Sequence, residues 1–123
     1  MKIRLRGNSI RYRLDKNDVE LLKATNKVES STHIGAGILH FCIKRKEISD
    51  PVIKLEADGV HLFLPEEQID NWLLPEQVGF EIIIPNTDGT EVKILVEKDF
   101  KCLNTRDEDD SQSFDHPNSG QNC

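Results

Sequence analysis

Five basic side chains in the first thirteen positions of the chain have a chemistry that suits the binding of an anion. They are Lys2, Arg4, Arg6, Arg11 and Arg13. Gly7-Asn8 between two alternating runs predicts a β-hairpin with a two-residue loop, in which Arg4 lies opposite Arg11. Because alternate strand residues point to opposite faces, the five cations are expected on one face. Arginine holds phosphate or carboxylate at two points and keeps its charge at every relevant pH. The hairpin is therefore a candidate anion-binding site.

The same alternation has a plainer interpretation. Charged residues on one side are typical of the solvent-exposed face of an antiparallel sheet, where carboxylates of the protein itself could neutralise them. Like charges opposite one another are mildly destabilising, so Arg4 over Arg11 is a conflict that either a ligand or an internal carboxylate would relieve. Both interpretations stay open at this point.

Three glutamates provide a second candidate site, this time for a metal ion. A turn at residues 86–89 pairs Phe80 with Val96 and keeps one face of a later hairpin apolar. The opposite face then carries Glu81, Glu91 and Glu97. Carboxylate oxygens are the ligands that Mg²⁺ prefers, so this set is the alternative to our main expectation of no metal and no cofactor.

The histidines and cysteines give no recognisable motif. The histidines are scattered, at His33, His40, His61 and His116. None is paired at metal-ligand spacing, and His40 with Cys42 lacks the third, orienting group that a nucleophile pair needs. Three cysteines cannot all pair, and Cys42 in an alternating strand is expected to be a buried apolar residue.

Length and charge limit the class of protein. A chain of 123 residues with 37% apolar residues fits one domain. Residues 1–16 carry six basic side chains against Asp15, whereas the whole chain has a net charge of −6. General nucleic-acid binding is not expected, because acidic surface would outweigh the basic stretch. Without an apolar membrane span or export leader, we expect a cytoplasmic protein that does not bind membranes.

The remaining patterns predict an α+β domain over residues 1–104. A helix is expected after Asp15, and strands over residues 27–34 and 38–45 are separated by a glycine bend. Asp58-Gly59 predicts a hairpin turn that pairs Leu55 with Leu62, and a helix from Pro65 repeats the hairpin-plus-helix plan. With no parallel crossover expected, the sheet should be mainly antiparallel, strongly curved or closed into a partial barrel, and built from three hairpins with two short covering helices.

Residues 105–123 differ from the rest of the chain. They are acidic and polar, with Phe114 as the single large apolar residue, and are expected to form a disordered tail. The acidic run 107–110 is a natural partner for the basic hairpin.

The opening Met1-Lys-Ile-Arg-Leu-Arg with Asn8-Ser-Ile-Arg-Tyr-Arg-Leu14, together with the closing run 96–103 and its acidic tail, resembles a family of small bacterial proteins of unknown function. That resemblance implies a bacterial cytosolic setting and no particular chemistry. The layout also resembles the triphosphate tunnel (CYTH-like) enzymes, in which alternating basic and acidic residues point into a barrel. This chain lacks their N-terminal Glu-x-Glu-x-Lys pattern, so the likeness is one of layout.

Three hypotheses follow. The leading one is a binding module, not an enzyme, whose basic hairpin binds a phosphate-bearing small molecule or an acidic protein. The first alternative is a metal-dependent triphosphate or nucleotide phosphohydrolase with a tunnel-like barrel. The second is a structural module whose acidic tail covers the basic hairpin.

Overall fold

The computed structural model describes residues 1–100, which form eight strands and two helices. In chain order the elements are β1 (Lys2–Arg6), β2 (Ser9–Leu14), α1 (Lys16–Thr25), β3 (Lys27–Ile34), β4 (Gly37–Lys46), β5 (Val52–Glu56), β6 (Gly59–Pro65), α2 (Glu66–Trp72), β7 (Gly79–Pro85) and β8 (Glu91–Lys98). The α+β class and the two helices are confirmed. The boundary expected at residue 104 and the tail that follows it lie outside the described residues.

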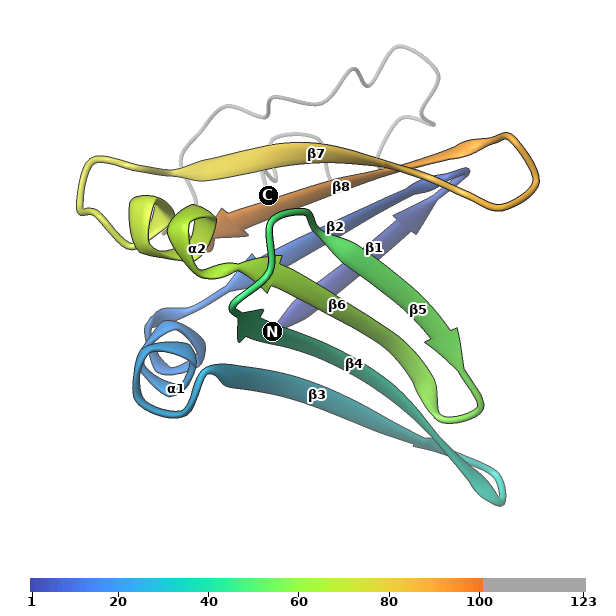
Figure 1. Cartoon of the computed structure of the whole chain (residues 1–123). Helices are drawn as coiled ribbons and strands as arrows, with labels where there is room; N and C mark the ends of the chain where they lie inside the picture. Colours follow the sequence, from blue (N-terminus) through green and yellow to red (C-terminus); the bar gives the residue numbers. More distant parts are fainter. Residues whose placement is uncertain (101–123) are drawn as a thin grey trace, which may run out of the picture.

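The strands form two separate sheets (Figure 1). Sheet A has the order β1-β2-β8-β7 and sheet B the order β3-β4-β6-β5. Most neighbouring strands are antiparallel, as predicted, but the central pairs β2–β8 and β4–β6 are parallel. The expectation of no parallel pairing was therefore wrong. Over residues 1–100 the strand orders close neither sheet on itself, so the partial barrel is not confirmed.

Four hairpins build these sheets, one more than predicted. The additional hairpin joins β3 to β4 through Gly35 and Ala36, with Ile34 opposite Gly37. We had expected the glycines here to make a bend or bulge. Gly35 has a φ of 58°, a conformation that glycine adopts without strain, and it completes a two-residue turn between antiparallel strands.

The fold consists of two copies of one unit. The unit β1-β2-α1-β3-β4 is followed by β5-β6-α2-β7-β8, and the first strands of the two copies begin 50 residues apart, at Lys2 and Val52. Replacing each strand by its counterpart turns the order β1-β2-β8-β7 into β5-β6-β4-β3, which is sheet B read from its other edge. Each sheet therefore combines the first hairpin of one copy with the second hairpin of the other.

The core lies between the two sheets, and the helices close the end where the sheets approach each other (Figure 1). Tyr12 from sheet A, Leu62 from sheet B and Trp72 from α2 are almost completely buried there. Asp15 begins α1 as a capping box with Asp18, which satisfies backbone N–H groups at the start of the helix. At the other end the sheets separate, and Leu5 and Leu55 at the hairpin tips are 61% and 84% exposed.

Two predicted strand registers are confirmed and one is wrong. The first hairpin pairs Arg4 with Arg11, and the last pairs Phe80 with Val96, as predicted. In the β5–β6 hairpin, however, Leu55 lies opposite Val60 instead of Leu62, because residues 57 and 58 form the turn and Gly59 belongs to the strand. The shift of two residues leaves the same side chains on the apolar face.

Candidate functional site

The five predicted cations share the outer face of sheet A, and we call them the basic face. They are Lys2, Arg4, Arg6, Arg11 and Arg13. The hairpin register places them on one side of β1 and β2. Tyr12 and Leu14, which alternate with them, are buried between the sheets, so the basic side chains point away from the core. The basic face therefore looks outward and does not line the lumen of a tunnel.

A shallow depression lies within the basic face. Its volume is about 110 Å³, and its lining residues are Lys2, Ile3, Arg4, Arg11 and Arg13. Since about 10–15 Å³ of such volume is enough to hold one water molecule, the depression has room for several waters or for a small anion. Four of the five predicted anion-binding residues thus surround one concave spot.

Glu97 on β8 contacts two of these cations. Its Oε1 accepts hydrogen bonds from Nε of Arg11 at 2.5 Å and from Nε of Arg13 at 3.3 Å. The parallel pairing of β2 with β8 places Glu97 directly beside Arg13. The side chains of Arg11 and Glu97 are only 20% and 19% exposed, so solvent screens this contact less than an ordinary surface ion pair. One internal carboxylate therefore holds two arginines of the basic face in place.

The described chain also ends beside the basic face. The carboxylate of Asp99 forms an ion pair with Nζ of Lys2 at 2.9 Å, and the backbone N–H of Asp99 donates to the carbonyl oxygen of Leu14. Asp99 therefore fixes the end of the described chain to the first hairpin.

The three glutamates of the predicted metal site are not brought together. Glu81 pairs with Lys93 at 3.3 Å, and Glu97 contacts the arginines. Glu91 lies opposite Pro85, four residues along β7 from Glu81, which corresponds to roughly 13 Å. Within residues 1–100 no three His, Cys, Asp or Glu side chains converge on a point that could hold a metal ion.

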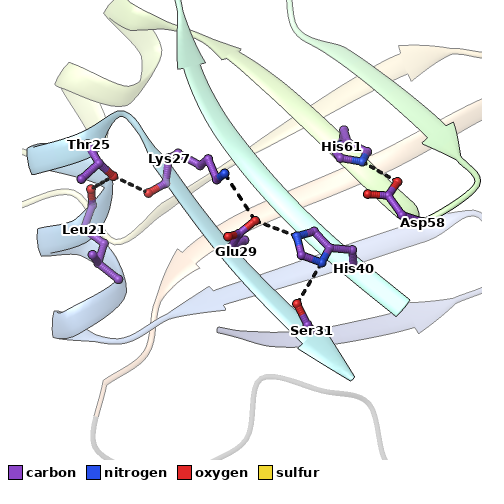
Figure 2. Close-up of polar contacts among 8 residues, drawn as sticks. All are labelled: Leu21, Thr25, Lys27, Glu29, Ser31, His40, Asp58 and His61. Carbon is purple, nitrogen blue, oxygen red and sulfur yellow. Dashed lines mark hydrogen bonds and ion pairs between the residues drawn. The ribbon is translucent and has the colours of Figure 1, made fainter. Parts of the chain in front are cut away.

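The outer face of sheet B carries a polar cluster that the sequence analysis did not predict. Nε2 of His40 lies 2.6 Å from the carboxylate of Glu29, and Nδ1 lies 2.8 Å from Oγ of Ser31 (Figure 2). Ser31 and His40 are direct cross-strand partners, whereas Glu29 is diagonal to His40. The hydrogen bond from His40, with a smaller effect of Lys27, lowers the pKa of Glu29.

His61 on β6 extends this cluster. Its ring is stacked on that of His40, with centroids 6.4 Å apart, and its Nε2 lies 2.9 Å from Asp58 (Figure 2). That hydrogen bond lowers the pKa of the Asp58 carboxyl group. The two histidines are thus each oriented by one carboxylate.

Cys42 lies on the same face of sheet B but is only 1% exposed. Its cross-strand partners are Glu29 on β3 and His61 on β6. Burial raises the pKa of the Cys42 thiol, which keeps it protonated and poorly nucleophilic at neutral pH. His40 does have the orienting carboxylate that we found lacking in the sequence, but Cys42 is the buried residue that we predicted.

The alternation of side chains along β3 and β4 was the signal that could have revealed the polar cluster of sheet B. Glu29 and Ser31 are two apart on one strand, as are His40 and Cys42 on the next, so each pair occupies one face. Relating the two strands requires recognition of the Gly35-Ala36 turn, which sets their register. The contact between Glu97 and the arginines has no such local signal, because 84 residues separate Glu97 from Arg13.

Comparisons with known proteins add a family but no activity. No curated protein and no solved structure matches the chain. In the part of the chain described, no helix is long and apolar enough to cross a membrane. Residues 1–118 match a family of unknown function (DUF7009), and the chain belongs to that family.

Proposed function

We propose that this protein is a binding module whose basic face takes a multiply charged anion, either a phosphate-bearing small molecule or an acidic segment of another protein. The observation that carries this proposal is the depression between the two strands of the first hairpin, which Arg4, Arg11 and Arg13 line together with Lys2. An anion in this depression could reach guanidinium groups from both strands.

The composition of the basic face favours anion binding over simple exposure to solvent. Four of its five cations are arginines, whose planar groups hydrogen-bond oxyanions at two points. Arg4 lies directly opposite Arg11, so one anion at this position could contact guanidinium groups of both strands. Glu97 supplies one negative charge beside Arg11 and Arg13, at the β8 side of the face.

Calorimetric titration with inorganic triphosphate tests this function. We expect the variant Arg4→Ala/Arg13→Ala to bind triphosphate at least about tenfold more weakly than the unchanged protein, since each lost charge-assisted contact contributes about 1 kcal/mol or more. The matched control is Lys16→Ala/Lys23→Ala, which removes two exposed positive charges from α1. Equal affinities of the two variants would mean that net charge alone matters and would contradict the proposal.

A second candidate function is a structural module in which the acidic tail occupies the basic face. The contact of Asp99 with Lys2 supports it, because the described chain ends beside the hairpin that the tail would cover. A fully extended segment of ten residues, such as 101–110, spans about 33 Å, which is more than the length of a five-residue strand. This length would allow the acidic run 107–110 to reach across the face.

Deleting residues 105–123 separates the two functions. If the tail covers the basic face, its removal should raise the affinity for triphosphate at least about fivefold, because a competing intramolecular ligand is lost. If the face binds an external ligand, the deletion should change the affinity less than twofold. A variant with Asp107, Glu108, Asp109 and Asp110 changed to Asn or Gln controls for the loss of chain length.

A further inference from the structure

Three lysines gather around one aromatic ring on the outer face of sheet B. The Nζ atoms of Lys46, Lys54 and Lys44 lie 4.8, 5.6 and 5.8 Å from the centroid of the Phe63 ring. Phe63 stands on β6 between β4 and β5, with Lys44 as its direct partner on β4. The three lysines therefore come from both neighbouring strands and converge on a single side chain.

This cluster is positively charged, and residues 1–100 supply no carboxylate that pairs with it. None of the three lysines forms an ion pair with a carboxylate of residues 1–100. All three ammonium groups lie within 5.8 Å of one point, so no two are more than about 12 Å apart, which is at most about one and a half Debye lengths at physiological salt. The negative face of the ring attracts each ammonium group, and this attraction opposes the mutual repulsion of the three lysines.

The internal repeat relates this cluster to the basic face. The paired strands β5 and β6 are the counterparts of β1 and β2, so Lys54 occupies the position of Arg4, and Phe63 the position of Arg13. Lys44 stands beside Phe63 as Glu97 stands beside Arg13. The carboxylate that neutralises part of the basic face on sheet A is thus replaced by a cation at the corresponding position of sheet B.

The geometry points to a second anion site on sheet B, in which Lys44, Lys46 and Lys54 bind a compact, multiply charged oxyanion. The ligand class is a di- or triphosphate group, either free or as part of a nucleotide, because lysine ammonium groups act as point charges toward phosphate. Phe63 is a positioning residue: it holds the ammonium groups together before the anion arrives and so lowers the ordering cost of binding. This site goes beyond the proposed function, which concerns the outer face of sheet A.

Residue-resolved NMR titration with inorganic triphosphate observes the two faces separately. We expect saturable shifts of the Phe63 ring protons and of the backbone amides of Lys44 and Lys54, in addition to shifts on β1 and β2. Shifts on β1 and β2 alone would overturn the second site and leave the proposed function intact. Shifts on sheet B alone would do the opposite, and shifts on neither sheet would overturn both.

Substitutions at Phe63 test its positioning role. Phe63→Leu keeps an apolar side chain but removes the ring, and we expect the Kd of the sheet B site to rise about fivefold through the lost cation–π attraction. Phe63→Tyr keeps the ring and should stay within about twofold of the unchanged protein. Equal effects of Leu and Tyr would contradict the role of the ring. Lys44→Gln/Lys46→Gln/Lys54→Gln should abolish the shifts on sheet B and preserve those on β1 and β2.

A parallel titration with ATP identifies the part of the ligand that is bound. If the phosphate chain is recognised, ATP should reproduce the shifts of triphosphate on sheet B with an affinity within about threefold. Binding of ATP without any binding of triphosphate would overturn the proposal, because the base and sugar would then carry the recognition.

Discussion

Gly59 lies so close to His40 that a Cβ atom added to it would stand 1.9 Å from the His40 carbonyl oxygen. The two residues are partners in the parallel pair β4–β6, and His40 N–H donates to the carbonyl oxygen of Asp58 at 2.8 Å. Gly59 also has a φ of 147°, which other residues rarely adopt. This close approach brings the His40 strand against the turn that carries Asp58.

Replacement of Gly59 by alanine should strongly destabilise the fold. The new Cβ would collide with backbone atoms of His40, which cannot move without breaking the β4–β6 pairing. We expect a loss of more than about 3 kcal/mol in the free energy of unfolding, measured by urea denaturation. Gly89→Ala is the control, since Gly89 has a φ of 90° but nothing within 4 Å of its added Cβ, and should cost about 1–2 kcal/mol. Equal costs would show that only the backbone angle matters.

The Gly59 contact also explains one error of the sequence-based prediction. An Asp-Gly pair is among the strongest local signals for a two-residue turn, so the sequence predicts a loop at residues 58 and 59. Here the glycine is required by a strand from elsewhere in the chain, and the turn moves back to Ala57 and Asp58. A shift of two residues nevertheless keeps Leu62 and Leu64 on the buried face.

Local structure could be predicted from the sequence, whereas the pairing between distant strands could not. The register of the first hairpin follows from its turn and its alternation, which is why the basic face was foreseen. The parallel pair β2–β8 joins strands more than 80 residues apart and is decided by how the two sheets bury their apolar faces together. The position of Glu97 beside Arg13 depends on that pair, so Glu97 was assigned to a metal set instead.

The stability of the His40 cluster should depend on pH. Hydrogen bonds from His40 and His61 lower the pKa values of Glu29 and Asp58 in the folded protein. Carboxyl groups whose pKa falls on folding stabilise the protein above their unfolded pKa, and this stabilisation disappears as the pH falls through the folded pKa.

We therefore expect Glu29→Gln/Asp58→Asn to be less stable than the unchanged protein above about pH 5 and to approach its stability below about pH 3. Urea denaturation across this range measures the difference. Glu67→Gln/Glu76→Gln makes the same change in net charge away from the histidines. A pH-independent difference for the first variant would contradict the role assigned to these hydrogen bonds.

Arg45 joins β4 of the first copy to α2 of the second copy and should stabilise the contact between the two copies. It donates to both carboxylate oxygens of Asp70, from Nη2 at 2.9 and 3.0 Å, and to Glu66 at 3.1 Å. Because Asp70 is more than half exposed, we expect the coupling energy of this pair to be modest, about 0.5–1.5 kcal/mol.

A double-mutant cycle with Arg45→Met and Asp70→Asn gives this coupling from urea denaturation. Arg45→Lys should retain less than half of it, since lysine cannot form the two-point contact. A coupling energy of zero within error would show that the contact does not hold α2 against the sheet.

Glu97 should set both the stability and the anion affinity of the basic face. Its carboxylate contacts Arg11 and Arg13 in a partly buried position, so Glu97→Gln should cost about 1 kcal/mol in the free energy of unfolding. The same change removes a negative charge that contacts two arginines of the depression and should raise the affinity for triphosphate about three- to tenfold, because the arginines no longer divide their charge between Glu97 and the ligand. Glu81→Gln is the matched control on the same outer face of sheet A, where Glu81 pairs with Lys93 instead of with the basic face. We expect it to change the affinity less than twofold in the same calorimetric titration. If Glu81→Gln and Glu97→Gln raise the affinity equally, the effect comes from net charge, and Glu97 has no specific control over the site.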